Sequence, residues 1–230
     1  MKINANFSEI ASVHTDTQEW IPSPMAGVDR KPLDRVGDEV ARATSIVRYA
    51  PKSHFSPHVH TGGEEFIVLE GIFQDQHGDY PVGSYVRNPP QSKHQPGSEE
   101  GCVIFVKLWQ FQPQDRQHVN LIMSKADVSF QDAKTQTIER TLFTDELEQV
   151  KYIELQAGCH WDSGANNGNE LLVISGSVKY KRTELNKHDW LRLPIGQALH
   201  IEAGNKGAKV WIKTGNLADL EKQINRLTEV

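Results

Sequence analysis

A short histidine-rich segment places the strongest constraint on how this chain can fold. It contains His58 and His60, then two glycines, then Glu64. In a β-strand, residues i and i+2 point to the same face and lie roughly 6.6 Å apart. Both imidazoles can therefore reach one cation, at about 2.0–2.1 Å. The two glycines permit a chain reversal that brings Glu64 to the same side.

A third histidine completes the predicted site. His94 follows Gly83 and Pro89 at the spacing Gly-x5-Pro-x4-His, after the apolar run that follows Glu65. Three imidazoles and one carboxylate suit a divalent transition metal such as Zn, Fe, Mn, Ni or Cu. Ordinary surface or core histidines are the alternative. We predict one metal site with four ligands, namely His58, His60, Glu64 and His94.

The rest of the pattern predicts an all-β chain. Short apolar runs separated by turn residues are typical of a sandwich or barrel. The expected strands lie at 43–50, 65–69, 84–87, 102–111 and 119–123. We expect irregular structure over residues 1–35, with Trp20 packed on a neighbouring surface, and a loop over 124–141. A C-terminal helix capped by Asn216 is expected to pack a stripe of apolar residues on the barrel or, alternatively, on a second copy: Leu217, Leu220, Ile224 and Leu227.

The second half of the chain repeats the first. Residues 65–71 (EFIVLEG) correspond to residues 170–176 (ELLVISG), and Phe55 corresponds to Trp161 after one deletion. We therefore predict two domains, 1–115 and 116–230. In the second copy Glu64 becomes Asn169 and His94 becomes Leu199, while His200 is one residue out of register. The second domain is expected to bind no metal and to serve as a structural partner or as a metal-free ligand pocket.

The motifs His-x-His-x3-Glu-x6-Gly and Gly-x5-Pro-x4-His resemble those of the cupin superfamily. The distance from Glu64 to His94, together with the segment that begins at Trp20, resembles the ChrR-type anti-sigma-factor cupin domain and its dioxygenase-like relatives, which cleave acetophenone or diketone substrates. The glycine usually found two residues after the proline is Gln91 here. The resemblance implies two tandem jelly-roll barrels (double-stranded β-helices), of which the first holds one metal, zinc in ChrR-type proteins.

The composition limits the kinds of partner that the protein is expected to bind. The net charge is -5 and the chain has no basic run, which argues against nucleic acid and against an anionic membrane. The mean hydropathy is -0.54. Two cysteines without CxxC spacing, Cys102 and Cys159, are expected to be free thiols, and no apolar signal segment follows Met1. A cytoplasmic protein is expected, and cupins often form homodimers.

Two functions remain open at this stage. The first is a regulatory or oxidative-stress sensor that binds a small molecule near the metal and signals to a protein partner. ChrR-type factors grip the sigma factor through a His-x3-Cys-x2-Cys domain, and that motif does not occur in this chain, so direct sigma-factor binding is in doubt. The second is a metal-dependent dioxygenase acting on a small ketone or diketone. A purely structural metal is the weaker alternative.

No catalytic acid or base can be named from the pattern. Glu65 should face away from Glu64 because neighbouring residues of a strand alternate. Lys107 could point into the barrel or reach the surface. Four further side chains could line the pocket: Arg48, Tyr49, Tyr85 and Arg87. The remaining histidines lack ligand spacing and are expected to be surface or hydrogen-bonded residues.

Overall fold

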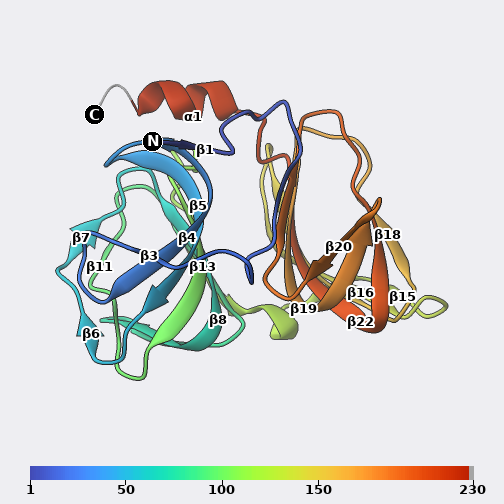
Figure 1. Cartoon of the computed structure of the whole chain (residues 1–230), viewed down its shortest axis with the longest axis horizontal. Coiled ribbons are helices and arrows are strands. Elements are labelled where there is room, and N and C mark those ends of the chain that lie inside the picture. The colour runs from blue at the N-terminus through green and yellow to red at the C-terminus, as the bar shows by residue number, and fades with distance from the viewer. Residues whose placement is uncertain (228–230) are drawn as a thin grey trace. The chain divides into compact units, whose positions relative to one another are not determined.

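The computed structural model, which describes residues 1–227, is built almost wholly of β-strands (Figure 1). The prediction of an all-β chain is confirmed. The chain divides into two compact units, described separately below. Closure of each unit into a jelly-roll barrel stays a prediction, as does the domain assignment 1–115 and 116–230. No described helix is long and apolar enough to cross a membrane.

Unit 1 comprises residues 1–5, 19–122 and the C-terminal segment from Glu221. Its main sheet has the strand order β1-β4-β5-β13-β8-β10-β14. These strands are β1 (Lys2–Ile3), β4 (Val28–Gly37), β5 (Ala41–Tyr49), β13 (Cys102–Leu108), β8 (Glu64–Asp75), β10 (Ser84–Asn88) and β14 (Val119–Ile122). The short strands are β3 (Ile21–Pro22), β6 (Ser53–His54), β7 (His58–Val59), β9 (Gly78–Pro81), β11 (Lys93–His94) and β12 (Gly97–Ser98).

Unit 2 comprises residues 6–18 and 123–220. Its sheet has the order β15-β16-β17-β22-β19-β21-β2, so the N-terminal segment supplies an edge strand. These strands are β15 (Val128–Asp132), β16 (Thr137–Thr144), β17 (Gln149–Leu155), β22 (His200–Thr214), β19 (Asn169–Tyr180), β21 (Trp190–Leu193) and β2 (Ala11–Val13). The remaining elements of this half are β18 (His160–Asp162), β20 (Thr183–Asn186) and the short 3-10 helix Met123–Lys125.

The glycine that ends each copy of the repeated motif has the same physical role in both units. Gly71 in β8 has φ +69°, and Gly176 in β19 has φ +74°. A Cβ at Gly71 would lie 2.1 Å from the carbonyl oxygen of Gly101, and one at Gly176 would lie 2.0 Å from that of Gly207. Only glycine allows the neighbouring strand so close at a positive φ. The sequence repeat is therefore also a repeat in backbone geometry.

Each unit buries its own apolar cluster. In unit 1 the cluster includes Phe66, Val68 and Ile104, and in unit 2 it includes Leu171, Val173 and Val210. The two cysteines are free thiols, as predicted. Burial raises the pKa of Cys102 to about 11.

Two segments expected to be irregular form strands, so those predictions are wrong. Within residues 1–35 the structure contains β4, and within residues 124–141 it contains β15 and the start of β16. Both were missed because the apolar/polar alternation is weak. Val128 and Phe130 of β15 are 45% and 51% exposed, so this edge strand is held by backbone pairing to β16 rather than by a buried face. Trp20 does pack on its surroundings, with the cations of Lys31 and Arg48 over its ring.

The C-terminal helix is shorter than expected. Helix α1 (Leu220–Arg226) begins four residues after Asn216, which instead donates a hydrogen bond to Glu170 (3.1 Å) and does not cap it. The buried residue of the helix is Gln223, not an apolar one. Its side chain accepts a bond from Arg42 Nε (2.9 Å) and donates one to the Gln110 carbonyl (3.2 Å). Of the predicted stripe, Leu217 is buried but lies before the helix, and Leu220, Ile224 and Leu227 are half-buried.

Candidate metal centre

The structure brings the three predicted histidines together. One ring nitrogen from each of His58, His60 and His94 lies within 4.8 Å of the others. Strands β7 and β11 pair so that His94 lies opposite His58. The backbone N–H of His60 donates to the Ser92 carbonyl at 2.9 Å, which fixes the third ring beside this ribbon. The ring centroids are 4.6–5.0 Å apart.

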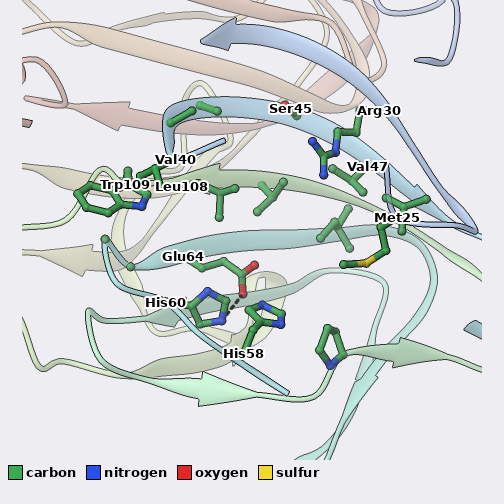
Figure 2. Close-up of a pocket in the computed structure, with 18 of the residues that line it drawn as sticks. Met25, Arg30, Val40, Ser45, Val47, His58, His60, Glu64, Leu108 and Trp109 are labelled. Carbon is green, nitrogen blue, oxygen red and sulfur yellow. Dashed lines mark ion pairs between the residues drawn. The ribbon is translucent and has the colours of Figure 1, made fainter. Parts of the chain in front are cut away.

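Glu64 approaches the same cluster from the start of β8. Its Oε2 lies 3.4 Å from His60 Nε2 (Figure 2). It lies 3.6 Å from His94 Nε2. The same oxygen accepts a hydrogen bond from Asn88 Nδ2 at 3.2 Å. All four residues predicted as ligands therefore meet at one place. Glu64, His60 and His94 are buried, whereas His58 is exposed.

A carboxylate outside the predicted set orients His94. Asp75 Oδ2, at the end of β8, lies 3.2 Å from His94 Nδ1, so Nε2 of this ring is the nitrogen turned toward Glu64. Burial lowers the pKa of His94, but the bond to Asp75 and the charge of Glu64 outweigh it and raise the pKa. Burial raises the pKa of Asp75, but the hydrogen bonds from His94 and the His77 N–H lower it by more. The pKa of Asp75 is therefore lowered overall. Sequence reasoning missed Asp75, since nothing in its spacing sets it apart.

His60 supplies the test of whether a metal fits. Its Nε2 is buried and has no hydrogen-bond partner among the described residues. Burial is the largest effect on this ring and lowers its pKa, which favours the neutral form. A neutral, unprotonated imidazole nitrogen is a metal ligand, and an unsatisfied buried nitrogen is otherwise costly. The residues present therefore fit a divalent transition metal.

A cavity of about 310 Å³ opens beside these ligands. His58, His60 and Glu64 form one part of its wall, and apolar side chains from β4, β5 and β13 form another part (Figure 2). Tyr49 also lines it, as the sequence allowed. Burial and the charge of Glu64 raise the pKa of Tyr49, so its hydroxyl stays protonated at neutral pH. Arg30 lines the cavity too and was missed, because its strand was not recognised.

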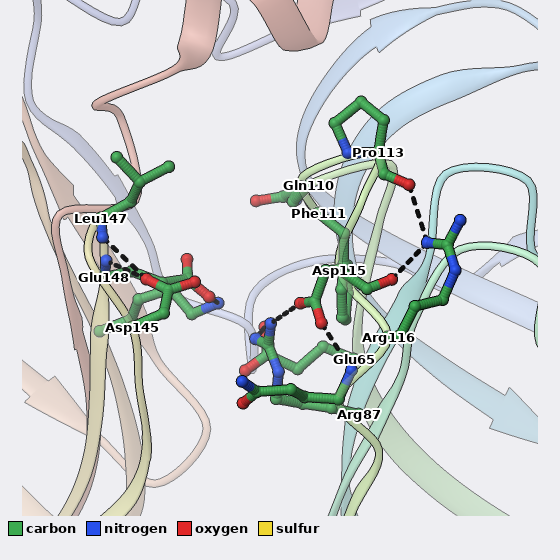
Figure 3. A network of polar contacts seen from close by, with 12 residues as sticks. Glu65, Arg87, Gln110, Phe111, Pro113, Asp115, Arg116, Asp145, Leu147 and Glu148 are labelled. Atoms are coloured by element: carbon green, nitrogen blue, oxygen red, sulfur yellow. Dashed lines mark hydrogen bonds and ion pairs between the residues drawn. The ribbon is translucent and has the colours of Figure 1, made fainter.

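The other candidate side chains do not line the cavity. Tyr85 and Arg87 both contact Glu65, which is 1% exposed: the Tyr85 hydroxyl donates to it at 2.6 Å, and Arg87 lies 3.8 Å away. Figure 3 shows Arg87 within this network, where it also pairs with Asp115 at 2.9 Å. Lys107 is fully buried and lies opposite Glu65 in the strand register. The prediction that Glu65 faces away from Glu64 agrees with these contacts.

Arg48 lies on the outer surface, where it pairs with Asp29 at 2.7 Å. This arginine is therefore absent from the cavity wall.

The corresponding positions of unit 2 carry a polar network in place of ligands. Asn169 is fully buried, accepts a hydrogen bond from the Ser163 hydroxyl (2.6 Å) and donates to the Gln197 carbonyl (2.8 Å). Leu199 is fully buried, whereas His200 is exposed and ion-paired with Asp162. Among the described residues, the only group of three or more histidine, cysteine or acidic side chains with metal-binding geometry is that of unit 1.

Comparison with known proteins finds a family model that matches part of the chain and solved structures with a similar fold. Residues 8–112 match the family model described as the ChrR cupin-like domain. A candidate dioxygenase from Nostoc punctiforme is similar in structure with a TM-score of 0.71 at 14% identity, covering 92% of this chain and 84% of that one. The nickel(II) complex of the bacterial pirin YhhW from Escherichia coli gives 0.65 at 12% identity, covering 90% and 98%.

A third solved structure extends the range of this likeness. A variant of salicylate 1,2-dioxygenase from Pseudoaminobacter salicylatoxidans gives a TM-score of 0.58 at 11% identity, covering 79% of this chain and 72% of that one. At these identities the likenesses show the fold alone. No curated protein matches the chain.

Proposed function

We propose that this protein, a member of the cupin superfamily whose residues 8–112 match the ChrR cupin-like domain, is a metal-dependent enzyme acting on a small organic molecule. The observation that carries the proposal is the cavity of about 310 Å³ whose wall includes three of the four proposed ligands. A structural metal site is usually closed by protein ligands, whereas a catalytic one adjoins open space. The proposed ligands are His58, His60, Glu64 and His94.

We favour dioxygenation of a small ketone or diketone as the reaction class. The structural likeness to a candidate dioxygenase and to a salicylate 1,2-dioxygenase variant supports it. When bound, the metal would supply Lewis acidity toward a carbonyl oxygen and, as iron, redox chemistry with O2. Cleaving a carbon–carbon bond with both oxygen atoms entering the two carbonyl products needs no further reductant.

The chain's own residues would bind and orient the substrate. Val47, Ile104 and Val106 give the cavity an apolar wall against which the body of an organic substrate can pack. The protonated Tyr49 hydroxyl can donate a hydrogen bond inside the cavity. Asp75 holds the His94 ring in one orientation, as a carboxylate behind a metal-ligating histidine commonly does.

A regulatory or small-molecule-sensing role is the second candidate. The match to the ChrR cupin-like domain favours it. In that role the same cavity would bind a ligand without turnover, and zinc would be the expected metal.

Metal analysis followed by oxygen uptake separates the two candidates. The purified protein is first assayed for bound metal, then loaded with Fe(II) and mixed with acetylacetone or acetophenone while O2 is recorded. If the protein is a dioxygenase, the O2 taken up should equal the substrate consumed. This uptake should be lost in a His60→Ala variant. It should be kept in His54→Ala, whose exposed ring faces Glu99. Absence of uptake by the iron-loaded protein, with zinc as the metal found in the protein as purified, would contradict the enzyme and support the sensor.

A further inference from the structure

Arg30 brings a positive charge into the cavity without a protein partner. It lies opposite Val47 in the β4–β5 register, and opposite residues of antiparallel strands share a face. Val47 belongs to the buried apolar cluster of unit 1, so Arg30 points to the inner side. Figure 2 shows its guanidinium among the side chains that line the cavity. Arg30 is half-buried.

The other arginines of unit 1 that enter the sheet have partners. Arg48 pairs with Asp29, and Arg42 lies 3.7 Å from Asp34. Arg35, which also lines the cavity, donates to the Gly37 carbonyl at 3.2 Å. Within the described part of the chain, the Arg30 guanidinium has no hydrogen bond or ion pair. A half-buried guanidinium that keeps no anion is expensive unless a ligand supplies one.

The internal repeat provides a matched comparison for this position. Following the register across unit 1, Arg30 lies opposite Val47, which lies opposite Ile104, which lies opposite Val68. The equivalent row in unit 2 starts from Val173, the repeat partner of Val68. It passes through Val210 and Ile153 to Glu139. Arg30 and Glu139 therefore occupy the same place in the two copies.

Unit 2 neutralises its inward charge with its own side chains. Glu139 accepts from Lys151 Nζ at 2.6 Å and from Trp161 Nε1 at 2.7 Å. The register places Ser45 of unit 1 at the Lys151 position, and Phe55 corresponds to Trp161. Serine carries no charge and phenylalanine carries no hydrogen-bonding group. The first copy thus has a charge at this place and neither of the partners that the second copy supplies.

From these observations we infer that Arg30 anchors a negatively charged group of the cavity's ligand. The ligand class is then a small organic anion, such as a carboxylate, with an apolar body against Val47 and Ile104. The inference rests on the proposed function, because the opposite end of the same molecule would face the metal ligands. Arg30 would act as a residue that determines specificity, not as one that performs chemistry.

The test compares two ligands that differ in charge and little else. Binding of 4-acetylbenzoate and of its neutral amide, 4-acetylbenzamide, is measured by calorimetry on zinc-loaded protein, so that no turnover is needed. We expect the anion to bind about ten-fold more tightly or better, as a charge-assisted hydrogen bond implies. Arg30→Gln should remove that preference and leave amide binding and metal content unchanged, and Arg30→Lys should keep part of it. Arg48→Gln, on the outer surface, is the control and should behave as the wild type.

Three results would overturn the inference: equal binding of the two ligands by the wild type, a preference for the anion that survives in Arg30→Gln, and binding of neither ligand. The wild-type comparison alone decides the first and third, even if a variant folds poorly. Metal content and O2 uptake are recorded on the same samples. A protein that holds no metal contradicts the proposed function, whereas metal-loaded protein without an anion preference contradicts only the role of Arg30.

Discussion

The contact between His94 Nδ1 and Asp75 shows how a single side chain outside the ligand set shapes the site. Nδ1 is hydrogen-bonded to Asp75 at 3.2 Å, so only Nε2 can face Glu64 and the other imidazoles. His60 is the complementary case, because its buried Nε2 lacks any hydrogen-bond partner in the described structure. Asp75 orients the His94 ring, and His60 Nε2 is left available to bind a metal. Together they favour a preorganised metal site over a chance cluster.

Substitutions at these two positions should differ in severity. His60→Ala removes a proposed ligand and should abolish stoichiometric metal binding. Asp75→Asn leaves all four proposed ligands in place and should weaken metal affinity by about 10–100-fold. His54→Ala is the matched control, since this exposed histidine lies outside the cluster. Titration with Zn against a competing chelator measures all three, and one metal per chain retained by His60→Ala would exclude the ligand set.

At the scale of elements, edge strand β15 and the terminal helix each depend on polar contacts that a hydrophobic pattern does not reveal. Strand β15 exposes both Val128 and Phe130 and relies on its backbone pairing with β16. Helix α1 buries Gln223, which bridges Arg42 and the Gln110 carbonyl. Neither kind of contact produces a clear periodic pattern of apolar residues in the sequence. Elements of this kind are therefore the ones that pattern analysis misjudges.

Removing the Gln223 amide should destabilise the chain. Gln223→Ala leaves buried polar groups of Arg42 and Gln110 with one partner fewer, which should lower the free energy of unfolding by about 1–3 kcal/mol. Glu221→Ala, on the exposed side of the same helix, should change it by less than about 0.5 kcal/mol. Urea unfolding followed by fluorescence measures both. Equal stability of the two variants would show that the bridge contributes nothing.

At the scale of the whole molecule, one β-unit occurs twice with different chemistry. Gly71 and Gly176 keep the same backbone geometry in both copies. The ligand positions diverge, since Glu64 has become Asn169, whose side chain is bonded within its own unit. Unit 1 therefore carries the proposed ligands beside a cavity of about 310 Å³, while unit 2 bonds the equivalent polar side chains to one another beside a smaller cavity of about 150 Å³.

Metal binding should accordingly stabilise the first unit. One metal per chain is expected, with slower amide hydrogen exchange at β7 and β11 and unchanged exchange at β18, which lies just before the equivalent position of unit 2. Metal at 100 times its dissociation constant stabilises the folded site by about 2.7 kcal/mol. Exchange followed by mass spectrometry, with and without Zn, gives the answer. Protection at β18 comparable to that at β7 would contradict a single site in unit 1.

The sequence by itself determined the all-β class, the repeat and the four residues that meet at the candidate centre. Strand periodicity and short motif spacing are local properties, and they can be read without knowing which strands are neighbours. Tertiary structure alone decided the cavity, the placing of Asp75 behind His94 and the inward charge of Arg30. Those depend on register between strands far apart in the chain, and a shift of one residue would have turned Arg30 to the outer face.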